Sequence, residues 1–267
     1  MEDRIKVTMS EGVADVRLVR ADKMNALDAA MFSALVDTAD RLHSTKGLRA
    51  VVISGEGRAF CAGLDMGRFG QMQEGKSSSS GGGSLAPRTH GPANAAQQAV
   101  WGWRQLPVPV IAAVHGVAFG GGFQLALGAD MRYLAPDARM SIMEIKWGLV
   151  PDMAGTPILK RLVRDDVLRD LTFTGRIFSA QEALAWGLAT RVCDDPHAAA
   201  LEAAREIAGK SPEAIRAVKR MLNDLMGDPA PSLLTESLEQ VKLMGKDNQR
   251  EAVRANLEKR APKFADV

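Results

Sequence analysis

Three consecutive glycines, Gly120, Gly121 and Gly122, lie within the segment GVAFGGGFQLALG at residues 116–128. The preceding apolar stretch is typical of a buried strand, and the following one is typical of a helix. Without a Cβ, glycine lets the backbone turn sharply and approach a ligand, and free N–H groups at a helix start bind negative charge. The segment therefore predicts either an oxyanion site or tight strand–helix packing without a ligand.

A second turn of small residues, GRAFCAGLDM at residues 57–66, directly follows the apolar run 50–54. The two turns could converge at the ends of neighbouring strands. Cys61 lies in this second turn, but no matching base accompanies it, so we expect a small packing residue. The four histidines show no metal-ligand spacing.

A candidate for proton transfer is Glu144, which has apolar neighbours in the segment SIMEIKW at residues 141–147. Such surroundings would raise the pKa of its carboxyl toward neutral pH, where it could exchange protons efficiently. The alternative is a structural acid paired with Lys146 or with an arginine. Asp152, in the following turn, taken alone is either a solvated loop residue or the start of a helix.

The elements that must position these residues alternate between strand and helix. Strands are predicted at 13–19, 50–54 and 108–114, and helices near 27–42 and 93–105. This alternation favours an α/β fold with parallel strand pairing.

Helical signals alone follow residue 195. Just before this region, a capping box formed by Ser179 and Glu182 starts a short helix that ends at Gly187. Later helices are predicted at 196–208, 211–225, 231–244 and 249–260. We therefore expect an α/β core at 1–195 and a C-terminal helical region at 196–267.

The composition excludes several classes of protein. The chain has 267 residues, 46% of them hydrophobic and 25% charged, with a net charge of +2, which fits a globular protein without a nucleic-acid footprint. Two distant cysteines, no secretory signal and no apolar stretch long enough for a membrane span predict a soluble, cytoplasmic protein. The polar stretch 73–94, with its Gly/Ser tract, is predicted to be a flexible loop, either a lid or a surface insertion.

Together, Asn25-Ala-Leu27, the run AFCAGLD at 59–65 and the three glycines resemble the crotonase superfamily of acyl-CoA hydratases and isomerases. The resemblance extends from about Val13 to the run EKRAPKF at 258–264. It implies a crotonase-like ββα spiral core, with the C-terminal helices serving trimerisation and active-site cover. It also implies a homotrimer or homohexamer that acts on an acyl-CoA thioester, with no cofactor or metal and with coenzyme A as part of the substrate.

Carried over residue by residue, the resemblance places an oxyanion hole at the backbone N–H groups of Leu64 and Gly121. Removing a proton next to a thioester, or adding to its β-carbon, passes through an enolate-like oxyanion that two donors stabilise. The Leu64 side chain should narrow the acyl pocket without removing the donor. The residues that would contact the substrate or its coenzyme A are Lys23, Met24, Ala62, Gly63, Asp65, Gly120, Met143, Pro151, Lys263 and Phe264.

The acids depart from the hydratase pattern, which has two glutamates. Glu144 matches the second, but Gln124 stands at the first position and can orient water without taking its proton. Asp152, eight residues after Glu144, matches an aspartate of dienoyl-CoA isomerases, whose further aspartate is Gln124 here. We therefore expect an enoyl- or dienoyl-CoA isomerase of the fatty-acid β-oxidation type, in which Glu144, Asp152 and Gln124 form the catalytic set.

The alternative within the same superfamily is an enoyl-CoA hydratase in which Glu144 handles the water with help from Gln124 or Asp152. Outside catalysis, the chain could be an acyl-CoA binder or an RNA binder. The acids argue against the first of these, and the lack of a clustered basic stripe argues against the second.

Overall fold

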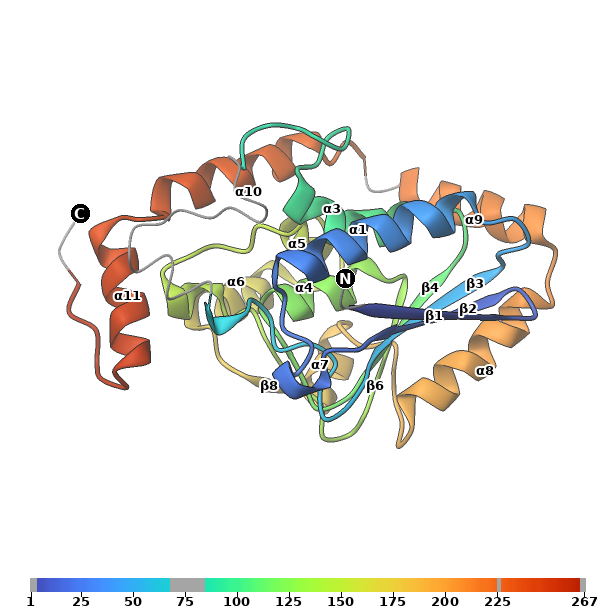
Figure 1. Ribbon diagram of the computed structural model, residues 1–267, viewed down its shortest axis with the longest axis horizontal. Coiled ribbons are helices and arrows are strands. Elements are labelled where there is room, and N and C mark those ends of the chain that lie inside the picture. Colours follow the sequence, from blue (N-terminus) through green and yellow to red (C-terminus); the bar gives the residue numbers. More distant parts are fainter. Residues whose placement is uncertain (1–3, 68–84, 225–226, 265–267) are drawn as a thin grey trace.

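A six-stranded sheet forms the main layer of the computed structural model, which describes residues 4–67, 85–224 and 227–264 (Figure 1). β1 pairs antiparallel with β2, and all other neighbours in this sheet pair in parallel. The three predicted strands are confirmed, although β4 begins after Pro109, which has no N–H to donate to a ladder. In sheet order, the strands are β1 (Ile5–Ser10), β2 (Val13–Leu18), β3 (Ala50–Gly55), β4 (Val110–Val114), β6 (Met131–Leu134) and β9 (Arg191–Val192).

A smaller sheet begins where the chain leaves β4. It contains β5 (Val117–Phe119), β7 (Arg139–Ser141) and β8 (Phe178–Ser179). Gly116 makes the turn with a φ of +59°, and a Cβ there would lie 2.1 Å from the carbonyl oxygen of Arg58. Glycine is therefore required at this position, and it brings β5 alongside the turn that follows β3.

Helices cover both faces of the main sheet. One face presents Val16, Val51 and Ala112 to a core that includes residues of α1 (Ala29–Ser44), α3 (Ala95–Gln105) and α4 (Gly121–Gly128). The opposite face presents Val52 and Ile111 to α8 (Pro196–Ala208) (Figure 1). Alternate strand residues therefore enter opposite cores, as the pleat requires, and this arrangement is the α/β fold that the sequence predicts.

The helices predicted after residue 178 form with similar bounds, but no prediction covered the helices at 21–23, 144–147, 155–159 and 165–174. The capping box of Ser179 and Glu182 is formed in both directions. α8 packs on the main sheet. The division of the chain into a core and a C-terminal helical region after residue 195 stays a prediction. The remaining helices are η1 (Ala21–Lys23), η2 (Glu144–Trp147), α5 (Gly155–Leu159), α6 (Asp165–Thr174), α7 (Ala180–Trp186), α9 (Pro212–Asp224), α10 (Ala230–Leu243) and α11 (Asp247–Leu257).

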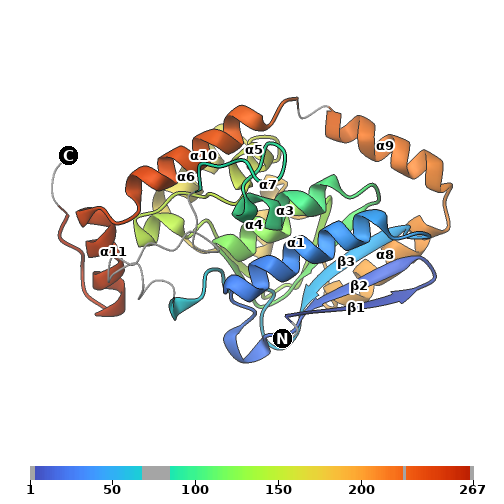
Figure 2. The same ribbon diagram turned by 45° about the horizontal axis from the view of Figure 1, so that its top comes forward.

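The last two helices lie over one end of the molecule. α10 runs across α5, and α11 packs near η2 (Figure 2). Residues 68–84, which include the Gly/Ser tract of the predicted loop, lie outside the described residues. Among the helices that the structure describes, none has the length and apolarity needed to cross a membrane.

Candidate active site

The two glycine-containing turns lie against each other, as their sequences suggested. Cys61 donates its N–H to the carbonyl of Val117 (3.1 Å), and the N–H of Phe119 donates to the carbonyl of Cys61 (3.1 Å). A Cβ on Gly63 would lie 2.5 Å from the Phe119 carbonyl oxygen, and a Cβ on Gly122 would lie 2.2 Å from that of Cys61. Only residues without a side chain allow this approach, so the glycines fix the distance between the two turns.

Hydrogen bonds on either side of Leu64 fix the first candidate oxyanion donor. Leu27 donates its N–H to the Gly63 carbonyl (2.8 Å), and Asp65 donates to the Leu27 carbonyl (3.1 Å). Within the described part of the chain, the N–H groups of Leu64 and Gly121 have no hydrogen-bond partner. Both residues line the same cavity, as an oxyanion hole built from their N–H groups would require.

That cavity has a volume of about 700 Å³ and a largely apolar wall, in which Phe32, Leu85 and Met244 take part. Its size suits a small-molecule ligand. Most of the predicted substrate-binding and catalytic residues lie on its wall: Lys23, Met24, Ala62, Gly63, Leu64, Asp65, Gly120, Gly121, Met143, Glu144 and Asp152.

Glu144, at the start of η2, places a buried carboxyl on this wall. One oxygen, Oε1, accepts a 2.7 Å hydrogen bond from Nε2 of Gln124, whereas the buried Oε2 has no partner among the described residues. Burial is the main cause that raises the pKa of Glu144 to about 7, and the charge of Glu236 adds to it. The apolar setting expected for Glu144 is therefore present. Lys146, the partner considered for a structural role of Glu144, instead places its Nζ 5.6 Å from the centroid of the Trp147 ring.

Gln124 does not line the cavity, in contrast to the predicted role of orienting a water beside the substrate. Its Oε1 accepts the backbone N–H groups of Met153 (2.9 Å) and Gly155 (3.0 Å), and its Nε2 donates to Glu144. Because two N–H donors require an acceptor, the amide can present only its NH₂ group to Glu144. Gln124 therefore lies behind Glu144 and holds one of its oxygens.

Asp152 brings a second carboxyl to the cavity wall. Its pKa is raised to about 8, first by burial and then by the negative charges of Glu144 and Glu236, while a hydrogen bond from Gln240 opposes the shift. Such surroundings favour the protonated form of the carboxyl at neutral pH, and the half-buried Asp152 is not a solvated loop residue. Its neighbour Pro151 is half-buried and lies outside the cavity lining.

Two side chains of α10 complete the site, and sequence reasoning missed both. Glu236 accepts the N–H groups of Ala154 (2.9 Å) and Thr156 (2.8 Å), and Gln240 accepts that of Val150 (3.0 Å). Gln240 also lines the cavity. The partners are 80 to 90 positions apart in sequence, and no local motif reports such packing.

The predicted coenzyme A contacts divide into two groups. Lys23 and Met24 lie on the cavity wall near Asp65, whose carboxylate is held by Arg20 at 2.6 Å. Lys263 and Phe264 are not on the wall. The Lys263 N–H donates to Glu251, and Phe264 is 57% exposed beyond the end of α11.

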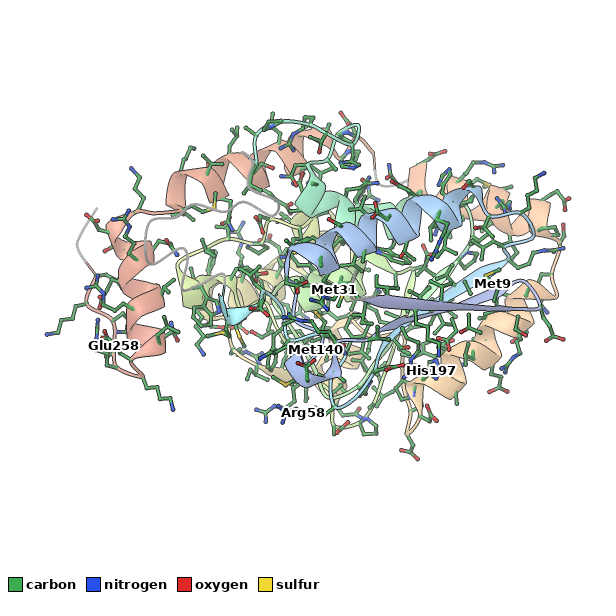
Figure 3. All side chains as sticks on the ribbon, viewed as in Figure 1. Met9, Met31, Arg58, Met140, His197 and Glu258 are labelled. Atoms are coloured by element: carbon green, nitrogen blue, oxygen red, sulfur yellow. The ribbon has the colours of Figure 1, made fainter. Side chains whose placement is uncertain are left out.

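Figure 3 labels Glu258 at this end of the molecule, directly after α11 and away from the sheets. The hydrogen bond to Glu251 folds the following tail back onto α11. The contact predicted between this tail and the ligand is therefore absent from the described cavity of this chain.

Cys61 is the packing residue expected from its sequence context. Its thiol is buried and donates to the Asn25 carbonyl (3.1 Å), and burial raises its pKa to about 12. Such a thiol stays protonated and is a poor nucleophile. In the ranges that the structure describes, no group of three or more His, Cys, Asp or Glu side chains could hold a metal ion.

The fold and the paired turns define an acyl-CoA enzyme of the crotonase type, and comparisons with known proteins agree. A family model described as enoyl-CoA hydratase/isomerase matches residues 8–267, and the chain belongs to this family. It is 32% identical to a probable enoyl-CoA hydratase of Bacillus subtilis, over 90% of each chain. It is 34% identical to a carnitinyl-CoA dehydratase of Proteus mirabilis, over 83% of this chain and 80% of the relative.

A solved structure with a similar fold is an enoyl-CoA hydratase/isomerase of Mycobacterium paratuberculosis. It has a TM-score of 0.84 and 27% sequence identity, and the match covers 95% of this chain and 98% of the other. The likeness extends over the C-terminal helices as well as the sheets. The crotonase fold predicted from the motifs is confirmed.

Proposed function

We propose that the chain is an enoyl- or dienoyl-CoA isomerase that shifts a carbon–carbon double bond along the acyl chain. One observation carries the proposal. Two carboxyls, Glu144 and Asp152, share a cavity wall with the free N–H groups of Leu64 and Gly121, and the pKa values of the two carboxyls are raised to about 7 and about 8. An isomerase needs one group that takes a proton and another that returns one elsewhere.

In this mechanism the thioester carbonyl oxygen accepts the two backbone N–H groups. The unpartnered Oε2 of Glu144 removes a proton from carbon, and the electron pair of that C–H bond moves through the conjugated system onto the thioester oxygen. Protonated Asp152 then gives its proton to the other end of the system, and the double bond forms in its new position. Proton exchange with solvent afterwards restores ionised Glu144 and protonated Asp152.

The two pKa values predict a bell-shaped pH dependence of kcat/KM. Activity should rise as Glu144 loses its proton through about pH 7 and fall as Asp152 loses its proton through about pH 8. Asp152→Asn should remove the alkaline limb and lower isomerisation by roughly 10²-fold. Rates measured across pH on 3-enoyl- and 3,5-dienoyl-CoA would check this, and an alkaline limb that survives in Asp152→Asn would contradict it.

The second candidate is an enoyl-CoA hydratase, favoured by the names of the two relatives. Here Glu144 would activate the water, and the missing second carboxylate would limit the rate. Gln124→Glu should then raise hydration of 2-enoyl-CoA by roughly tenfold or more, because the new carboxyl, although behind the cavity wall, would lie within hydrogen-bond distance of Glu144 and could exchange a proton with it. Gln105→Glu, at the exposed end of α3, is the matched control.

One assay separates these functions. Purified protein is incubated with 2-enoyl-, 3-enoyl- and 3,5-dienoyl-CoA, and the products are separated by chromatography and weighed by mass spectrometry. An isomer of unchanged mass supports the isomerase, and a product heavier by one water supports the hydratase. Binding without turnover would indicate an acyl-CoA binder and would overturn both. Assembly as a homotrimer or homohexamer and a cytoplasmic location stay predictions.

A further inference from the structure

α10 holds the segment that carries Asp152 at two points, one helical turn apart. Gln240 accepts the N–H of Val150 before Asp152, and Glu236 accepts those of Ala154 and Thr156 after it. Gln240 and Asp152 both line the cavity, and because Val150 occupies the Oε1 of Gln240, this residue has only its NH₂ group to offer the Asp152 carboxyl. The orientation of Asp152 therefore depends on a helix more than 80 residues further along the chain.

Glu236 is a buried acid whose hydrogen-bond donors among the described residues are uncharged. Only 5% of its surface is exposed, and its oxygens accept two backbone N–H groups and the Nε2 of Gln97 (3.1 Å). Arg88 is a cation close enough to act on it, but its guanidinium donates to Gln97 (3.0 Å) and Ser237 (2.9 Å). Burial raises the pKa of Glu236 itself to about 7, and once Glu236 is ionised its charge raises the pKa of Glu144 and of Asp152.

We propose that α10 controls the protonation of the active site through two positioning residues with opposite effects. Gln240 orients Asp152 and stabilises its ionised form. Ionised Glu236 repels negative charge at both Asp152 and Glu144 and so keeps them protonated to a higher pH. This inference rests on the proposed function only where it assigns the alkaline limb of activity to Asp152.

The signs follow from elementary electrostatics. A neighbouring negative charge disfavours ionisation of a carboxyl, so removing the Glu236 charge lowers the pKa of both Asp152 and Glu144. A hydrogen bond to the ionised form favours ionisation, so removing the Gln240 amide raises the pKa of Asp152 and leaves Glu144 unchanged. A merely structural role would reduce activity without moving either limb.

The test compares Glu236→Gln, Gln240→Met and Glu239→Gln. The last is the control, because Glu239 is an exposed acid on the same helix, paired with Lys242. Glu236→Gln should move both limbs of the pH–rate profile about one unit toward acid, and Gln240→Met should move only the alkaline limb, toward base, by a similar amount. Unmoved limbs in both variants, or shifts in the same direction, would overturn the proposal.

A second readout does not depend on the reaction. The pH titrations of the Asp152 and Glu144 carboxyls are followed by NMR in ligand-free protein labelled with ¹³C at the side-chain carboxyls, with Asp152→Asn and Glu144→Gln giving the assignments. Opposite shifts in this titration support the inference even if the protein proves to be a hydratase. Titrations unaltered by both variants overturn it even if isomerase activity is found. Should Glu236→Gln fail to fold, the direction of the Gln240→Met shift decides.

Discussion

Replacing Glu144 with glutamine should reduce kcat by about 10³–10⁴-fold on whichever enoyl-CoA thioester the enzyme turns over. The substitution keeps the size of the side chain and an oxygen for the Gln124 hydrogen bond (2.7 Å). It removes the carboxylate oxygen, Oε2, which is buried and has no hydrogen-bond partner among the described residues. Steady-state rates and the pH–rate profile measure the effect, and the acid limb near pH 7 should vanish because its titrating group is gone.

The loss should be confined to the chemical step. Coenzyme A thioesters should bind with a Kd within about twofold of the wild type, because Glu144 contributes little to ground-state binding in this mechanism. Glu206→Gln, in which an acid that is 75% exposed is neutralised on α8, should leave all of these quantities unchanged. An unaltered pH–rate profile in Glu144→Gln would refute the role of Glu144 as the base.

The oxyanion turns could be predicted from sequence because their chemistry is local. Glycine is required at 63 and 122 because a Cβ would lie 2.5 and 2.2 Å from backbone oxygens, and at 120 because φ is +51° with ψ at −120°. The local sequence around these glycines therefore predicts the close approach of the two turns. The same holds for the strands at 13–18 and 50–55, whose apolar pattern reflects burial in the main sheet.

The orientation of Gln124 could not be predicted in this way. In α4, every residue from Gly122 to Gly128 is buried, so the helix has no polar face to show which side meets the cavity. Gln124 lies four residues after Gly120, where the hydratase pattern has a glutamate, and contact with the substrate was therefore expected. The backbone N–H groups of Met153 and Gly155 instead bind its amide oxygen and turn the NH₂ group to Glu144.

Long-range packing explains the other differences. Glu236 and Gln240 lie on α10, and their contribution depends on how that helix crosses α5. The sequence shows an amphipathic helix there but not what it packs against. Conversely, Lys263 resembled a ligand contact, yet its backbone is bonded to Glu251 beyond the cavity. Short strands such as β8 and β9, of two residues each, were also missed because pairing rather than composition defines them.

Gly63→Ala should lower kcat/KM by about 10²–10³-fold, because it disturbs the oxyanion site without touching a carboxyl. The new Cβ would lie 2.5 Å from the carbonyl oxygen of Phe119, a backbone atom that cannot rotate away. The turn carrying the Leu64 N–H must therefore move away from the turn carrying the Gly121 N–H. Two donors that no longer converge lose most of their effect on the developing oxyanion.

Gly47→Ala is the matched control for this change. Gly47 has a φ of +76°, similar to the +89° of Gly63, but a Cβ there would meet nothing within 4 Å. Both variants should therefore lose about 1–2 kcal/mol of stability from the left-handed backbone, measurable by thermal unfolding, whereas only Gly63→Ala should lose activity. Equal activity losses in the two variants would mean that backbone strain, not the spacing of the two donors, limits the rate. If only Gly63→Ala loses activity and both carboxyl titrations are unchanged, the paired turns contribute to catalysis independently of Glu144 and Asp152.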